Sequence, residues 1–138
     1  MSEQSQPVVT ILIVEDHPAT LAAVERLVSD AFPACRILTA GSAERALELC
    51  TNHHPPHVVV MDIVLPEMDG IEATRRIKSA LPHTHVVMHS SHDLPMYRDA
   101  AAVAGADAFV SKNKTFRELV PAITRLLPPA APGAGTCG

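Results

Sequence analysis

Five short apolar runs recur along the chain, and each is followed by turn-forming or charged residues. Runs of this length that are rich in β-branched side chains are typical of strands buried on both faces. The strands predicted in this way cover residues 8–14, 36–40, 58–61, 85–90 and 108–110.

The stretches between these runs carry apolar residues at helical spacing. Pro18 is placed to open the first helix, Ser42 to cap the second, and Gly105 to end the fourth. The predicted helices cover residues 18–32, 43 to before Pro55, 71–81, 95–104 and 115–127.

The last predicted helix carries two conflicting signals. Thr115 and Glu118 have the spacing of a capping box, in which two side chains bond the backbone at the helix start. Pro121 lies inside the same helix, where a proline removes one backbone hydrogen bond at a cost of about 3 kcal/mol. We therefore expect a kinked or irregular first turn.

Strands that alternate with helices in this way form a parallel sheet covered by helices on both faces. The expected fold class is a single α/β, doubly wound domain over residues 8–127. Residues 1–7 are expected to form a disordered tail. Residues 128–138, PPAAPGAGTCG, are expected to form a tail or the start of a linker.

Composition narrows the function classes. The chain has 138 residues, 47% hydrophobic and 19% charged, as expected of one globular domain. A net charge of −4 and only four aromatic residues argue against direct nucleic-acid binding. No apolar run approaches the roughly 20 residues of a membrane helix, and the polar start MSEQSQP lacks the pattern of a secretion signal. We expect no membrane association and a cytoplasmic location.

Polar residues stand at the ends of four predicted strands. Glu15 and Asp16 follow the first, Asp62 follows the third, Ser90 ends the fourth and Lys112 follows the fifth. Parallel strands end at one edge of a sheet, which is where ligands bind in open α/β folds. Three carboxylates, a hydroxyl and an ammonium are therefore expected at one shallow site.

This set of side chains indicates phosphoryl chemistry. Carboxylates so close together resist joint ionisation unless a cation lies among them, and a hard ion with oxygen ligands, Mg²⁺, suits them. Asp62 is then a candidate nucleophile that accepts a phosphoryl group, while Lys112 and Ser90 contact its oxygens. The chain has no GxxxxGK[ST] motif to hold a nucleotide.

The sequence resembles the receiver domain of two-component response regulators. The resemblance covers residues 8–127 and is carried by four segments: ILIVEDHP (11–18), MDIVLPEMDG (61–70), VVMHSS (86–91) and GADAFVSK (105–112). It implies a flavodoxin-like fold with strand order 2-1-3-4-5. It also implies a signalling switch in a phosphorelay, which is no enzyme beyond its own phosphoryl transfer and slow dephosphorylation.

The resemblance assigns a role to each site residue. Asp62 is the expected phospho-acceptor, and the phosphodonor is the phosphohistidine of a sensor kinase or phosphotransfer protein. The expected Mg²⁺ ligands are Glu15, Asp16, Asp62 and the backbone carbonyl of Val64. The remaining expected roles are the ammonium of Lys112, the switch hydroxyl of Ser90 and the switch aromatic side chain of Phe109.

Two positions depart from the family pattern. Phe109 stands where many members have Tyr, so its rotamer cannot be held by a phenolic hydrogen bond. Val64 is apolar where some members carry a polar side chain that assists an attacking water. The hypothesis that follows is a slow self-dephosphorylation.

The output is expected on the face made by the fourth helix, the fifth strand and the last helix, around residues 97–104 and 109–119. The sequence leaves open a homodimer through this face. His17-Pro18 after the acidic pair is similar to receivers that carry a C-terminal helix-turn-helix domain, so transcription is one conceivable output.

Three alternatives compete with this interpretation. Strand alternation sends the histidines around the fourth strand, such as His89, to opposite faces, which argues against a zinc site. A Mg²⁺-dependent phosphatase usually needs a second Asp where Val64 stands. A pseudo-receiver, which is a protein-interaction module without phosphorylation, conflicts with the intact set of Glu15, Asp16, Asp62, Ser90 and Lys112.

Overall fold

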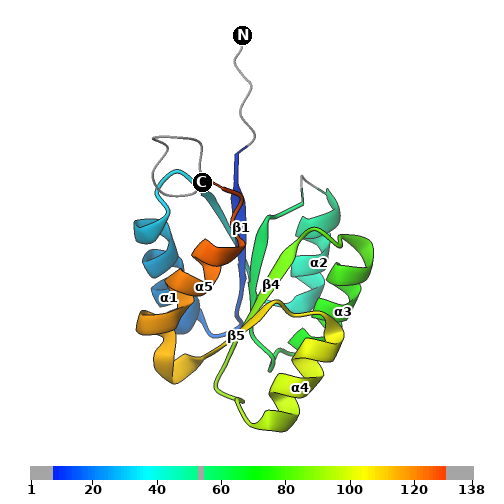
Figure 1. The fold of residues 1–138 in the computed structure, drawn as a ribbon. Coiled ribbons are helices and arrows are strands. Elements are labelled where there is room, and N and C mark those ends of the chain that lie inside the picture. The colour runs from blue at the N-terminus through cyan, green and yellow to red at the C-terminus, as the bar shows by residue number, and fades with distance from the viewer. Residues whose placement is uncertain (1–7, 53–54, 130–138) are drawn as a thin grey trace.

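Five parallel strands form one sheet in the order β2-β1-β3-β4-β5 in the computed structural model, which describes residues 8–52 and 55–129 (Figure 1). This order and the flavodoxin-like fold agree with the prediction. The strands are β1 (Thr10–Val14), β2 (Arg36–Ala40), β3 (Val58–Met61), β4 (His85–Ser90) and β5 (Ala108–Ser111).

Helices cover both faces of the sheet. α1 (Pro18–Ala31) and α5 (Thr115–Leu126) lie on one face, and α2 (Ala43–Asn52), α3 (Gly70–Ala80) and α4 (Pro95–Ala104) lie on the other (Figure 1). A short 3-10 turn, η1 (Lys112–Lys114), joins β5 to α5. None of the described helices combines the length and the apolarity that a bilayer crossing needs.

Alternation along the strands builds two hydrophobic cores. In β1, Ile11 and Ile13 pack with Val24 and Val28 of α1, whereas Leu12 packs on the face covered by α2, α3 and α4. All five side chains are almost fully buried. Because β1 and β3 are buried on both faces, their carboxyl ends are held rigidly, and the residues that follow them emerge at one edge.

The element ends agree with the predicted ones to within a few residues. β1 begins at Thr10 rather than at residue 8, because Val8 is 60% exposed and has no place in either core. Ser42 caps α2 as predicted, since its Oγ accepts the backbone N–H of Arg45 at 3.1 Å. The expected tail, residues 1–7, and the expected linker beyond Pro129 lie outside the described residues.

The predicted capping box at the start of α5 is wrong. Lys114 occupies the N-cap position without a side-chain cap bond, and Thr115 uses its hydroxyl elsewhere. The Thr115 Oγ1 donates to the Lys112 carbonyl at 2.8 Å and contacts His89 Nε2 at 2.8 Å. The helix continues through Pro121, so the proline does not end it.

Gly70, the first residue of α3, lies against the backbone that carries Asp62. Its N–H donates to the Ile63 carbonyl at 2.8 Å, and a Cβ at position 70 would lie 1.8 Å from the Asp62 carbonyl oxygen. The Gly70→Ala variant should therefore lose about 3 kcal/mol of stability or more, because the Asp62 backbone must move. Chemical denaturation measures this loss.

Gly41→Ala is the matched control for this prediction. A Cβ at position 41 would have no atom within 4 Å, so its stability should stay within about 0.5 kcal/mol of the original chain or rise slightly. Equal stability of the two variants would show that the close approach of Gly70 to Asp62 has no energetic importance.

Candidate functional site

The Lys112 ammonium connects two carboxylates that come from different strands. Its Nζ lies 2.7 Å from Glu15 Oε1 and 2.8 Å from Asp62 Oδ2. Glu15 directly follows β1 and Asp62 directly follows β3, while Lys112 follows β5. Glu15 and Asp62 are 2% and 4% exposed. The convergence predicted from the parallel sheet is therefore present for these three residues.

The two carboxylates are shifted in opposite directions. Burial raises the pKa of Asp62, and the nearby charge of Glu15 adds to this, while the Lys112 hydrogen bond offsets only part of it. Burial also acts to raise the pKa of Glu15, but hydrogen bonds from Lys112 and His17 outweigh it and leave that pKa lowered. Glu15 is thus the more firmly ionised of the pair, and Asp62 is a carboxylate whose negative charge is poorly stabilised.

Asp16 offers an oxygen without a hydrogen-bond partner. Its Oδ1 is buried and accepts no hydrogen bond in the described part of the chain, although His17 Nδ1 lies 3.3 Å away. Glu15, Asp16 and His17 together present three ligand atoms within 4.8 Å of one another. Two carboxylates with an unsatisfied oxygen fit a hard divalent cation such as Mg²⁺.

The candidate metal site in the described part of the chain consists of Glu15, Asp16 and His17, which is not the same set as the expected Mg²⁺ ligands. His17 belongs to it and was not predicted, although it directly follows the acidic pair in the sequence. Asp62 is not a member of this cluster. Its Oδ1 accepts the N–H of Ile63 at 2.7 Å, and its Oδ2 accepts a hydrogen bond from Lys112. Val64 is 49% exposed in the loop that follows β3.

Ser90 is fully buried at the end of β4, the strand next to β3. Its Oγ accepts the N–H of His92 at 3.0 Å, and that bond leaves the hydroxyl proton available as a donor. Ser90 therefore lies at the predicted edge, but its hydrogen bond with His92 holds the following loop and does not involve Asp62.

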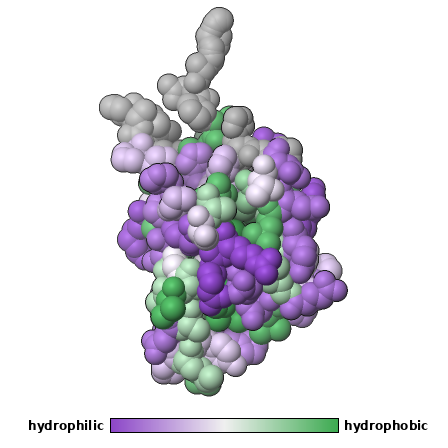
Figure 2. Space-filling model, turned by 90° about the vertical axis from the view of Figure 1, so that its right-hand side faces the viewer, coloured by the Kyte–Doolittle hydropathy of each residue, from purple (hydrophilic) through white to green (hydrophobic). Residues whose placement is uncertain are grey.

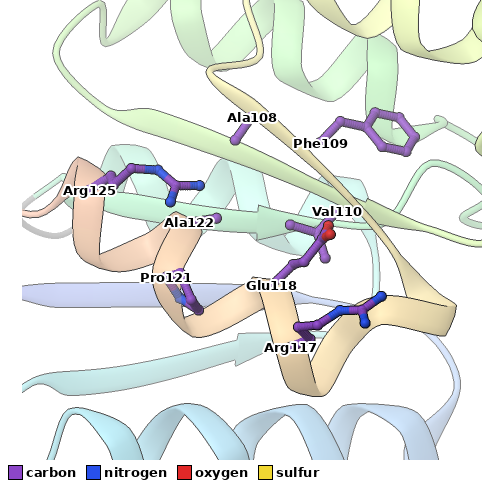
Figure 3. A pocket seen from close by; sticks show the side chains of 8 residues that line it. All are labelled: Ala108, Phe109, Val110, Arg117, Glu118, Pro121, Ala122 and Arg125. Atoms are coloured by element: carbon purple, nitrogen blue, oxygen red, sulfur yellow. The ribbon is translucent and has the colours of Figure 1, made fainter.

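Phe109 is half-buried in β5 and faces α4. The Arg98 guanidinium lies 4.5 Å from the centre of its ring, a cation–π contact that the sequence did not indicate. Figure 3 shows the Phe109 ring on the opposite side of β5 from Val110, which points toward α5. Phe109 thus connects the sheet to α4.

A groove lies between β5 and α5 on the face predicted as the output surface. It has a volume of about 370 Å³. Its lining residues, labelled in Figure 3, are Ala108, Phe109, Val110, Arg117, Glu118, Pro121, Ala122 and Arg125. Figure 2 shows the neighbouring face, where apolar side chains gather at the lower end over α4. Met96 and Val103 of α4 are 67% and 85% exposed.

His89 forms a contact that sequence reasoning missed. It is buried in β4, as expected for a packing residue, and its Nε2 lies 2.8 Å from Thr115 Oγ1. Burial, followed by the charge of Lys112, lowers the pKa of His89 to about 4. No sequence signal linked position 89 to position 115, because the capping-box spacing assigned Thr115 to a local partner.

The lowered pKa of His89 predicts an acid-sensitive fold. The unfolded chain binds a proton at His89 near pH 6.5 and the folded chain only near pH 4, so stability is complete above 6.5 and falls as the pH drops through this window. The loss attributable to His89 should reach about 3 kcal/mol. Urea denaturation at a series of pH values measures it.

A His89→Gln variant controls this prediction, because glutamine does not titrate and should flatten the slope between pH 6.5 and 4.5. Glu15, whose lowered pKa acts in the same direction, contributes only below its ordinary value of 4.5. An unchanged slope in the variant would assign the acid sensitivity to other groups.

Residues 11–124 match the family model of the response regulator receiver domain. Among curated proteins, the chain is 33% identical over 86% of its length to the transcriptional regulatory protein MctR of Rhizobium johnstonii. It is 34% identical over 85% of its length to the transcriptional activator protein ExaE of Pseudomonas putida. The matched regions are 55% and 54% of those proteins, so the chain spans about half of their length.

Solved structures give the same result. A two-component response regulator of the LuxR family from an Aurantimonas species superimposes with a TM-score of 0.78 at 32% identity, over 85% of this chain and 83% of that one. The BeF3-activated DrrB receiver domain superimposes with a TM-score of 0.77 at 27% identity, over 87% and 97% of the two chains.

Proposed function

The chain belongs to the response regulator receiver domain family and thus to two-component signalling, and from this premise we propose that it is a phosphorylation-activated switch. Asp62 accepts a phosphoryl group from a phosphohistidine on a sensor kinase or phosphotransfer protein. A carboxylate oxygen of Asp62 forms the new bond to phosphorus as the bond to the donor imidazole nitrogen breaks.

The observation that supports this proposal most directly is the position of the Lys112 ammonium. It contacts Asp62 Oδ2 at 2.8 Å and Glu15 Oε1 at 2.7 Å, so a fixed positive charge lies beside the proposed acceptor. Charge developing on the transferred oxygens is stabilised by such a preorganised cation. The raised pKa of Asp62, caused first by burial, is common at functional sites.

Receiver domains bind Mg²⁺ at an acidic pocket, and the pocket of this chain holds Glu15 and Asp16. We propose that these two carboxylates hold the ion, with Asp62 and the Val64 backbone carbonyl completing the set and His17 beside it. When bound, Mg²⁺ supplies positive charge for the phosphoryl oxygens. The Ser90 hydroxyl, whose proton is available, is proposed to donate to a phosphoryl oxygen.

The proposed response is a rearrangement of the face made by α4, β5 and α5. Movement of Ser90 toward the phosphoryl group changes the end of β4, and Phe109 on the neighbouring strand follows with its partner Arg98. The groove beside Arg117 and Arg125 then serves partner binding or a homodimer. The domain is proposed to act in the cytoplasm.

The output is proposed from the relatives. MctR and ExaE are named as a transcriptional regulator and a transcriptional activator, and they are about twice as long as the matched region. We propose residues 8–127 as the receiver domain and a linker after it, through which phosphorylation controls transcription.

The direct test is incubation with acetyl phosphate and Mg²⁺. Intact-mass spectrometry should detect one added phosphoryl group that is lost in alkali, as an acyl phosphate is. No uptake from acetyl phosphate or from a phosphorylated histidine kinase would replace the proposal with the pseudo-receiver, a module that binds partners without phosphorylation. Continuous release of phosphate with rapid turnover would instead indicate a phosphatase.

The exposed Val64 side chain predicts a long-lived phosphorylated state. It provides no group to orient an attacking water, whereas Val64→Asn places a carboxamide at the same position. The variant should dephosphorylate about tenfold faster, which is less than a true general base contributes. The measurement is phosphate release after removal of the phosphodonor, with Val64→Leu as the apolar control. Equal lifetimes in the Asn and Leu variants would reject the hypothesis.

A further inference from the structure

His89 and Ser90 are neighbours in β4, so their side chains point to opposite faces of the sheet. His89 is the penultimate residue of the strand, it pairs with Val110 of β5, and it is 3% exposed. Val110 belongs to the core on the α1 and α5 side, and His89 contacts Thr115, the first residue of α5, on that same side. A polar imidazole in this core is unusual and must be satisfied by a partner.

The direction of the hydrogen bonds follows from the number of protons. Thr115 Oγ1 donates its single hydroxyl proton to the Lys112 carbonyl at 2.8 Å. The same oxygen must then accept from His89 Nε2 at 2.8 Å, so the imidazole is the neutral tautomer with the proton on Nε2. The pKa of about 4, lowered first by burial, keeps this neutral form at physiological pH.

These two bonds hold the turn from which Lys112 projects. The carbonyl of Lys112 belongs to η1, the turn between β5 and α5, and its Nζ reaches Asp62 and Glu15. A lysine side chain has several rotatable bonds, so any movement of its backbone must be compensated by a change in those bonds for the ammonium to stay against both carboxylates. β4 thereby carries Ser90 and also, through the contact of His89 with Thr115, holds the backbone of Lys112.

We infer that His89 is a positioning residue: acting through Thr115, it fixes the backbone of Lys112 so that the ammonium is held against Asp62. This inference rests on the proposed function, because it assigns a role in phosphoryl transfer to Asp62. It adds to that function a buried side chain that touches none of the reacting groups.

The test compares phosphoryl uptake from acetyl phosphate with Mg²⁺, expressed per folded molecule, in several variants. His89→Leu and Thr115→Val each remove one partner of the contact and should slow uptake about tenfold, the value of one ordinary hydrogen bond. His89→Gln keeps an N–H near the Nε2 position and should restore most of the rate. The double variant should be no slower than either single variant, because both break the same link.

Thr84→Val is the matched control. Thr84 is equally buried and donates to the Pro56 carbonyl at 2.8 Å. It directly precedes β4, however, and so lies at the opposite end of that strand from Ser90 and the candidate site. It loses the same kind of hydrogen bond and should leave the rate unchanged. NMR of the histidine ring nitrogens adds a readout independent of phosphorylation: His89 should show the Nε2–H tautomer, with a signal that moves in Thr115→Val.

Several outcomes would overturn the inference. The first is an unchanged rate of uptake in a folded His89→Leu variant. The second is equal slowing in His89→Leu and His89→Gln, and the third is equal slowing in Thr84→Val. Any of these results would mean that His89 only packs in the core. If His89→Leu does not fold, the rate of uptake by Thr115→Val alone decides between a positioning role and a packing role for His89. If the unsubstituted protein takes up no phosphoryl group, the proposed function fails and the inference fails with it. If the unsubstituted protein and the His89 and Thr115 variants all take up the group at the same rate, only the inference is overturned.

Discussion

Asp62→Asn is expected to abolish phosphoryl uptake completely. The amide has almost the shape of the carboxylate and can still accept the N–H of Ile63, but it is a very weak nucleophile toward phosphorus. Stability should not fall much, because burial already raises the Asp62 pKa and the buried negative charge is unfavourable. Intact-mass spectrometry after treatment with acetyl phosphate and Mg²⁺, together with urea denaturation, measures both effects.

Asp69→Asn is the control in the same loop. Asp69 caps α3 by accepting the N–H of Glu72 at 2.8 Å, and asparagine caps a helix equally well, so uptake and stability should stay normal. Phosphoryl uptake by the Asp62→Asn variant would show that another carboxylate is the acceptor. If partner binding still responded to acetyl phosphate in the Asp62→Asn variant, the output would not depend on phosphorylation of Asp62.

Lys112→Met is expected to slow phosphoryl uptake about 10³-fold, the usual effect of removing one preorganised positive group from a transition state. It should also cost about 3 kcal/mol of stability at neutral pH, since Glu15 and Asp62 lose their shared cation while buried. The pKa of Glu15 then rises above its unfolded value, and the pKa of Asp62, which is already raised by burial, rises further. The variant should therefore regain stability as the pH falls through the carboxylate range.

Lys114→Met is the control, because Lys114 belongs to the same turn and its side chain is exposed. Its substitution removes the same formal charge and should change neither the rate nor the stability by a measurable amount. Equal effects of the two substitutions would mean that net charge matters and the contact to Asp62 does not. Urea denaturation at pH 7 and pH 4.5 distinguishes the cases.

The sequence was most informative where chain direction alone decides geometry. Parallel strands end at one edge, so residues that follow β1, β3 and β5 must lie near one another, and the ion pairs of Lys112 with Glu15 and Asp62 follow that rule. Buried strands also leave a strong local signal, as β3 does with Val58–Met61. Strand order came from the family resemblance, because apolar patterns do not specify which strands are neighbours.

The contacts that escaped prediction depend on side-chain choices between several partners. Thr115 could bond Glu118 locally or groups on β4 and η1, and only packing in three dimensions selects His89 and Lys112. The cation–π contact of Arg98 with Phe109 has the same origin, since nothing in the sequence indicates which partner an exposed arginine will contact. His17 directly follows the acidic pair in the sequence, but the position of its ring relative to Glu15 and Asp16 depends on the conformation of the loop and could not be predicted.

Lys112 and Glu15 are 97 positions apart in the chain, and Lys112 and Asp62 are 50 apart. The charged centre therefore does not exist in any fragment that lacks β1 or β5, nor in an intermediate in which the last strand has not docked. If Asp62 is the phospho-acceptor, as proposed, a nascent chain exposes it before the Lys112 ammonium is in place beside it. On the proposed function, competence to accept a phosphoryl group is thus a property of the finished fold, and a chain that lacks β5 should take up the group far more slowly than the complete domain.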